Sequence, residues 1–153
     1  MTPEQLFSIC NYIVLPGWAL LLLAPWWRWT TRLISSIIIP VLLSIIYTYL
    51  IVTYMNTTDG TYESLEGVAR IFENPNLLLA GWVHYLAFDL FVGVWEVQDS
   101  RRLGLLHWYI APCLLFTFLL GPIGLLMYLT IRLILKGAVF MEYPSEDDSE
   151  DTE

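Results

Sequence analysis

Three long stretches without a charged residue constrain this chain more than any other feature of its sequence. They contain 23, 26 and 29 residues and lie between Glu4 and Arg28, between Arg32 and Asp59, and between Arg102 and Arg132. A helix needs about 20 apolar residues to cross a bilayer, so each stretch is long enough for one crossing. Only 14% of the residues are charged, which leaves too little polar surface to enclose a water-soluble core. We therefore expect an integral membrane protein.

The apolar segments predict an all-α fold, a polytopic membrane helix bundle of about four transmembrane helices. The expected spans are roughly residues 6–27, 33–55, 75–98 and 105–135. The last segment is long for a single crossing and contains Gly121-Pro122, so we expect a kinked or tilted last helix. A re-entrant or a five-crossing arrangement is the less favoured alternative. The more polar segment 64–72 is too short to span and predicts a short helix at the membrane interface.

The chain divides into a transmembrane helix-bundle domain, residues 1–137, and an acidic tail, residues 138–153. The formal net charge of −8 belongs almost entirely to the segment Glu142–Glu153, which has seven acids and no base. Such a composition cannot bury apolar surface, so we expect the tail to be disordered. The rest of the chain is close to neutral, and no basic surface suited to nucleic acid is present. The bilayer itself is the expected partner.

The basic residues in short loops predict the orientation of the chain. Four arginines fall in the first and third expected loops and three basic residues on the other side; they are Arg28, Arg32, Arg101 and Arg102 against Arg70, Arg132 and Lys136. This bias favours both short loops on the cytoplasmic side and both termini on the opposite side. The first residues, Met-Thr-Pro-Glu-Gln, resemble neither a signal peptide nor a transit peptide. We therefore expect a bacterial inner membrane, with a thylakoid-type membrane as the alternative.

One predicted span carries ionisable groups at membrane depth, where they are costly and usually functional. Asp89 lies near the middle of the third span, and Glu96 shares its helix face because seven residues turn the helix through about 700°. His84 lies about 140° away from Asp89. We predict Asp89, His84 and Glu96 as candidate catalytic residues. The structural alternative is that these side chains only form hydrogen bonds between helices.

Further residues near this span are candidate substrate-binding groups: Trp82, Tyr85, Asp99, Arg101 and His107. A His/Asp/Glu set can in principle hold a divalent metal. The spacing here matches no standard ligand motif, and one metal reaches both His84 and Asp89 only if another helix contributes or if the helix is distorted. The identity of any metal or cofactor is therefore left open. The two cysteines, Cys10 and Cys113, fall in apolar spans and are expected to be packing residues.

Several motifs resemble the abscisic-acid-deficient family of small multi-helix membrane proteins. They are Gly81-Trp-Val-His-Tyr-Leu-Ala-Phe-Asp89, Asp99-Ser-Arg101, Pro112-Cys113 and Gly121-Pro-Ile-Gly-Leu125. The resemblance covers nearly the whole chain to about residue 136. For the plant members it implies a role in carotenoid metabolism, the opening of the violaxanthin epoxide to an allene on the way to neoxanthin.

The residues and the resemblance together favour an acid–base isomerase that acts on a carotenoid or another isoprenoid lipid, because an intramembrane acid and base suit that chemistry. Two hypotheses from other classes stay open. One is a membrane protein that binds carotenoid or lipid, or organises a complex, without catalysis. The other is a small proton-coupled carrier, since intramembrane acids also serve proton relays.

Overall fold

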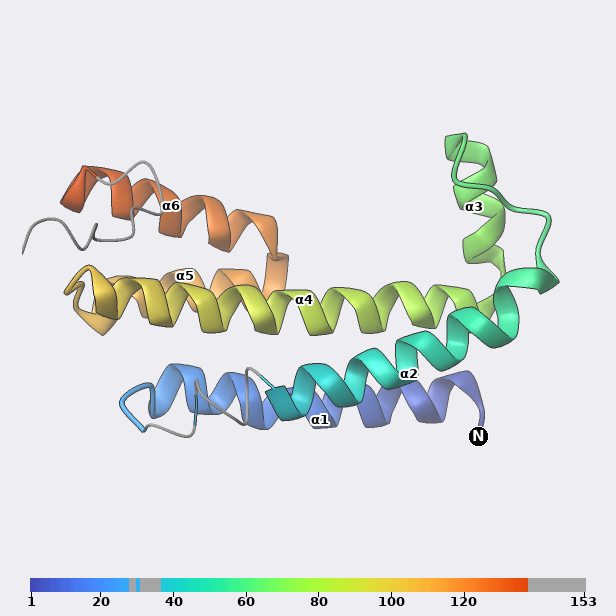
Figure 1. Ribbon diagram of the computed structural model, residues 1–153, viewed down its shortest axis with the longest axis horizontal. Coiled ribbons are helices and arrows are strands. Elements are labelled where there is room, and N and C mark those ends of the chain that lie inside the picture. The colour runs from blue at the N-terminus through green and yellow to red at the C-terminus, as the bar shows by residue number, and fades with distance from the viewer. Residues whose placement is uncertain (28–29, 31–36, 138–153) are drawn as a thin grey trace, which may run out of the picture.

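The computed structural model describes residues 1–27, 30 and 37–137, and these residues form the all-helical fold that the sequence predicts (Figure 1). The elements are α1 (Pro3–Leu23), α2 (Ile39–Tyr54), the short 3-10 helix η2 (Met55–Thr57), α3 (Leu65–Glu73), α4 (Pro75–Arg102), α5 (His107–Leu120) and α6 (Pro122–Lys136). The predicted acidic tail and the loop arginines Arg28 and Arg32 lie outside the described residues.

Among the described residues, three helical segments are long and apolar enough to cross a membrane: α1, α2 continued by η2, and α4. Helix α4 has 28 residues and is the axis of the bundle, because α1, α2, α3, α5 and α6 all pack against it. Half of its most apolar window is buried, against 28% for α1 and 17% for α2 with η2. The outer helices therefore present most of their apolar surface outward, as lipid-facing helices do.

Local signals in the sequence explain where the helices begin. Thr2 and Gln5 form a capping box at the start of α1. Ser64 accepts a hydrogen bond from the Gly67 backbone N–H and caps α3. Asn74 caps α4 by accepting from the Asn76 backbone N–H at 2.9 Å. Helix α3 confirms a short helix at the expected residues 64–72.

The fourth predicted span differs from a single kinked helix. At Gly121 the chain reverses, and α6 returns antiparallel alongside α5 (Figure 1). Gly121 has φ +51° and ψ −101°, a backbone conformation that glycine adopts readily and other residues avoid. Gly124 has no side chain to hold α5 away, and a Cβ there would overlap the Thr117 backbone. The bend expected at Gly121-Pro122 is therefore a tight hairpin.

This hairpin covers only part of the depth of the bundle. Helices α5 and α6 have 14 and 15 residues, so each is about 21–22 Å long at 1.5 Å per residue, against about 30 Å of hydrocarbon. The hairpin enters and leaves at the end of the bundle where α4 ends (Figure 1). Lys136 therefore lies at the opposite end from Met1. The expectation that both termini share one face assumed that the last segment crosses completely, and the described part of the chain instead turns back at Gly121.

Candidate functional site

Helix α4 directs three acidic side chains toward the α5–α6 hairpin: Asp89 at its middle, then Glu96 and Asp99 toward its C-terminal end. The helix continues to Arg102, so Asp99 lies within it and not in the loop expected at residues 99–104. The three acids are not equivalent, because the hairpin covers Glu96 and Asp99 fully and reaches Asp89 only with its turn.

Glu96 is completely buried between α4 and α5. Its Oε1 accepts a hydrogen bond of 2.9 Å from the Thr117 hydroxyl, while its Oε2 has no hydrogen-bond partner among the described residues. A carboxyl group in such surroundings is costly, and the Thr117 bond offsets only part of that cost. No described groove reaches Glu96, so a ligand touches it only if the hairpin moves.

Asp99 is the centre of a buried cluster between α4 and α6. The Tyr128 hydroxyl donates to Asp99 Oδ2 at 2.5 Å, and Arg132 Nε forms an ion pair with the same oxygen at 3.0 Å. All three side chains are buried, and the Trp95 ring packs edge-on against Tyr128 with ring centroids 5.4 Å apart. The cluster holds the end of α6 against the end of α4, and this pairing fixes the returning arm of the hairpin.

Asp89 meets the hairpin at its turn. A Cβ added to Gly121 would lie 3.0 Å from Asp89 Oδ1 and 3.2 Å from Oδ2, so the carboxyl group lies directly against the glycine. The Tyr85 side chain, one helical turn before Asp89, interacts with the carboxyl group. Asp89 Oδ2 is buried and has no hydrogen-bond partner among the described residues. Asp89 and Tyr85 thus form an acid and hydroxyl pair at mid-depth, with capacity left to bond a ligand.

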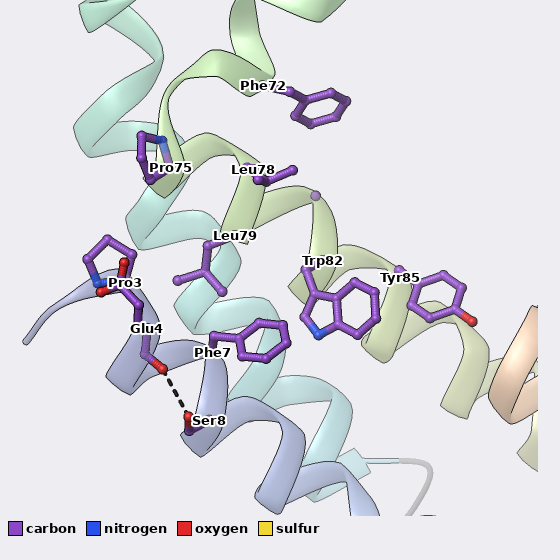
Figure 2. A pocket seen from close by; sticks show the side chains of 11 residues that line it. Pro3, Glu4, Phe7, Ser8, Phe72, Pro75, Leu78, Leu79, Trp82 and Tyr85 are labelled. Atoms are coloured by element: carbon purple, nitrogen blue, oxygen red, sulfur yellow. Dashed lines mark hydrogen bonds between the residues drawn. The ribbon is translucent and has the colours of Figure 1, made fainter.

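A groove of about 690 Å³ lies beside this pair, along the N-terminal half of α4 (Figure 2). Its walls come from the start of α1, from α3 and from α4, and Tyr85 lies at the end nearest the hairpin. The aromatic lining residues are Phe7, Phe72, Trp82 and Tyr85, and the polar ones include Glu4 and Ser8. This volume suits a lipid chain or a drug-sized ligand.

Aromatic contacts build the wall of the groove. The Trp82 ring packs against Phe7 and Tyr85, with centroids 5.5 Å and 5.3 Å away, and its Nε1 donates to Asn11 Oδ1 at 3.2 Å. Gly81 lets the Phe72 ring lie on α4, since a Cβ there would be 2.9 Å from that ring. The predicted binding residues Trp82 and Tyr85 therefore line one surface that leads to Asp89.

Three other predicted site residues lie elsewhere. His84 is exposed on another face of α4, where it stacks on Phe88 with centroids 4.4 Å apart and packs near Tyr47 of α2. His107 Nε2 is 3.0 Å from the Leu22 carbonyl oxygen at the end of α1. Arg101 is exposed in the last turn of α4. The structure thus separates His84, His107 and Arg101 from Asp89. For His84, the offset of about 140° along the helix predicts this separation.

The described residues contain no cluster of three or more His, Cys, Asp or Glu side chains that is suited to a metal ion. Cys10 and Cys113 are buried in the apolar core.

Sequence reasoning did not find the hairpin side of the site, formed by Thr117, Gly121, Tyr128 and Arg132. One signal was available: Arg132 interrupts an apolar segment, and a buried arginine in a membrane needs an acidic partner. Asp99 is such a partner, and pairing the two requires the last segment to turn back. Phe7 and Phe72 carried no comparable signal, because aromatic residues in apolar helices are common.

Comparison with known proteins gives one family and one relative. The family model described as ABA DEFICIENT 4-like matches residues 5–128. The chain is 25% identical over 144 residues to the protein ABA DEFICIENT 4, chloroplastic, of Arabidopsis thaliana, across 88% of this chain and 63% of that protein. The chain thus spans about 63% of the length of this relative.

No solved structure matches this chain. The relative is a chloroplast protein by its name, so the expectation of a bacterial inner membrane has no support here. The family match covers most of the helical bundle, from α1 into α6, and includes Asp89 and the residues around it. The chain is therefore a member of the ABA DEFICIENT 4-like family of membrane proteins.

Proposed function

We propose that this protein is an acid–base isomerase of a carotenoid or another isoprenoid lipid, with Asp89 as the group that moves protons. One observation carries the proposal: an aromatic groove ends at Tyr85, and the Tyr85 side chain interacts with the Asp89 carboxyl group, which has an unpartnered oxygen. Glu96 Oε2 is also unpartnered, but the hairpin covers Glu96 completely, whereas Asp89 is only partly buried and lies one helical turn beyond Tyr85. Tyr85 lies between groove and carboxyl group and is suited to orient a ligand oxygen toward Asp89.

The charge of the groove supports a neutral ligand. Glu4 is the only charged residue among those that line it, and the Asp89 carboxyl group lies one helical turn beyond the lining residue Tyr85. A phosphate or diphosphate group would meet acids and no lining base, which is unfavourable in a medium of low dielectric constant. A neutral lipid with hydroxyl, keto or epoxide groups matches both the aromatic walls and the Tyr85–Asp89 end.

Opening an epoxide to an allenic alcohol needs no oxidant or reductant. The epoxide C–O bond breaks, its oxygen takes a proton and becomes a hydroxyl, and a C–H bond loses its proton while its electron pair forms the new double bond. Asp89 in its acid form supplies the first proton, and the resulting carboxylate removes the second. The two transfers cancel, so a single carboxyl group returns to its starting state after each turnover.

A second candidate function is lipid or carotenoid binding without catalysis. The packed rings of Phe7, Trp82 and Tyr85 favour it, because they form a preorganised surface for a long conjugated or branched chain. This function needs the groove but not proton transfer. Asp89→Asn would then leave it largely intact.

The two functions separate in a bacterium that accumulates epoxy-carotenoids and expresses this chain. We expect the wild-type protein to convert pigment, Asp89→Asn to insert normally and convert none, and both to co-purify with pigment. Tyr85→Phe should retain pigment and convert it more slowly, because the ring stays and only the hydroxyl is lost. Normal conversion by Asp89→Asn at normal abundance would overturn the isomerase and leave the binding function.

A further inference from the structure

The groove and the hairpin occupy opposite halves of α4. The groove lies along the part of α4 that begins at Pro75, and Asp89 is 14 residues further on, at the midpoint of the helix. That separation corresponds to about 21 Å along the helix axis. Beyond Asp89 the α5–α6 hairpin covers the same side of α4, with Glu96 and Asp99 buried beneath it. A chain that enters the groove therefore meets a closed end in the middle of the membrane.

The two ends of the bundle differ in basic residues. Arg101, Arg102, Arg132 and Lys136 belong to the end where α4 and α6 finish. Among the described residues the other end has Arg70 alone. The positive-inside rule assigns the basic end to the cytoplasmic side or its equivalent. Four full crossings would place Arg132 and Lys136 at the opposite end of the bundle. The reversal at Gly121 brings them to the basic end, so the excess of basic residues at that end is larger than the sequence predicts.

We propose that the groove is a half-membrane binding site, open only to the leaflet on the N-terminal face, opposite the basic end. Its occupant is one neutral isoprenoid chain with an oxygen-bearing end group, and this assignment rests on the proposed function. The occupant enters between α1 and α3, lies along the Phe7–Trp82–Tyr85 wall, and places its reacting end beside Asp89. The hairpin blocks access to the groove from the other leaflet.

Charge complementarity selects this occupant over the phospholipids that surround the protein. The groove has a carboxylate, Glu4, at its start and no base among its lining residues, and the Asp89 carboxyl group lies one helical turn beyond Tyr85 at the inner end. An anionic headgroup is repelled at both positions. A neutral alcohol or epoxide finds hydrogen-bonding groups instead, from the Ser8 hydroxyl at the mouth to Tyr85 at the inner end.

Cysteine labelling tests sidedness and occupancy in one experiment. The single variants are Ser8→Cys in the groove mouth, Glu63→Cys on the same face outside the groove, and Lys136→Cys at the basic end. Cys10 and Cys113 are fully buried and stay in place, and the unsubstituted chain reports their background labelling. Spheroplasts of an expressing bacterium receive a membrane-impermeant maleimide, with or without the neutral C20 alcohol geranylgeraniol. Geranylgeranyl diphosphate is the charged control probe.

We expect Ser8→Cys and Glu63→Cys to react from outside and Lys136→Cys only after permeabilisation. Geranylgeraniol at about ten times its dissociation constant should slow labelling of Ser8→Cys by about tenfold and leave Glu63→Cys unchanged. The diphosphate should protect neither. If Ser8→Cys fails to accumulate, Leu78→Cys on the α4 wall of the groove replaces it.

The contrary results distinguish the two claims. Protection by geranylgeraniol with Ser8→Cys labelled from the same side as Lys136→Cys would overturn the sidedness and leave the proposed function standing. Labelling on the expected sides without protection by geranylgeraniol would overturn the groove as a lipid site, and the proposed function with it. Equal protection by the diphosphate would overturn the neutral occupant.

Discussion

The two halves of α4 differ in how their polar groups are satisfied. In the C-terminal half, Asp99 is bonded to Tyr128 and Arg132, and Glu96 accepts from Thr117 with one of its two oxygens; the hairpin buries both acids. At the midpoint of the helix, Asp89 has an unpartnered oxygen one helical turn beyond Tyr85, which lines the open aromatic groove of the N-terminal half. A satisfied polar cluster in a membrane holds helices together, whereas an unsatisfied group beside a cavity is available to a ligand. Similar residue types on one helix thus serve different purposes because of their neighbours.

The largest effect on stability is expected from breaking the buried cluster. Arg132→Met leaves the Asp99 carboxylate buried without its cation, and such losses cost about 3–5 kcal/mol. The measurement is unfolding in detergent, followed by loss of helical signal. Arg70→Met is the matched control, because Arg70 pairs with Glu66 at 2.6 Å on exposed α3 and should contribute little. Equal stability of the two variants would mean that the cluster does not hold the hairpin.

The double variant Asp99→Leu with Arg132→Met sharpens this test. Removing both charges removes the unpaired carboxylate and leaves only the neutral Tyr128 hydroxyl without its acceptor, which costs less than a buried charge. We therefore expect the double variant to be more stable than Arg132→Met alone. If the double variant were instead less stable than both Arg132→Met and the unsubstituted protein, the stability would come mainly from the ion pair itself and not from avoiding an uncompensated buried charge.

A smaller effect is expected at the hairpin turn, where the two halves meet. Gly121→Ala places a methyl group 3.0 Å from Asp89 Oδ1 in a backbone conformation with φ +51°. Gly104→Ala is the control, because Gly104 has φ +62° with nothing within 4 Å of the added Cβ. Each change should cost about 1–2 kcal/mol of unfolding free energy for backbone strain. Only Gly121→Ala should also lower activity, by displacing Asp89, and equal activity of the two would contradict that role.

The smallest effect is expected at Thr117. Thr117→Val keeps the shape of the side chain and removes the hydroxyl that donates to Glu96. Hydrogen bonds between membrane helices average about 0.6 kcal/mol, so we expect a loss of that order. Thr130→Val is the control, since its hydroxyl bonds only the Leu126 carbonyl within α6. Thermal unfolding in detergent compares the two, and a larger loss for Thr130→Val would argue against the Glu96 contact.

The sequence was sufficient for the helices and for part of the site. The uncharged stretches predict the spans because hydrocarbon thickness sets helix length. The shared face of Asp89 and Glu96 follows from helical geometry alone, and α4 bears it out. Both inferences rest on local properties, which a single sequence contains.

The hairpin could not be fixed in the same way. Gly121-Pro122 permits either a kink or a reversal, and the choice depends on the contact between Asp99 and Arg132, 33 positions apart. The groove also depends on the reversal at Gly121. The N-terminal half of α4 stays uncovered only because α5 and α6 do not extend along it. Long-range packing, and not local chemistry, decided that part of the structure.

The most direct test of the account compares Asp89→Asn with Glu96→Gln. Both replace a carboxyl group in α4 by its amide, one beside the groove and one beneath the hairpin. Pigment conversion and membrane abundance are measured together in the epoxy-carotenoid-accumulating bacterium. The account predicts that Asp89→Asn inserts at normal abundance and loses conversion, whereas Glu96→Gln keeps conversion per molecule. Loss of conversion by Glu96→Gln at normal abundance, with Asp89→Asn active, would contradict the division of α4 into an open functional half and a closed structural half.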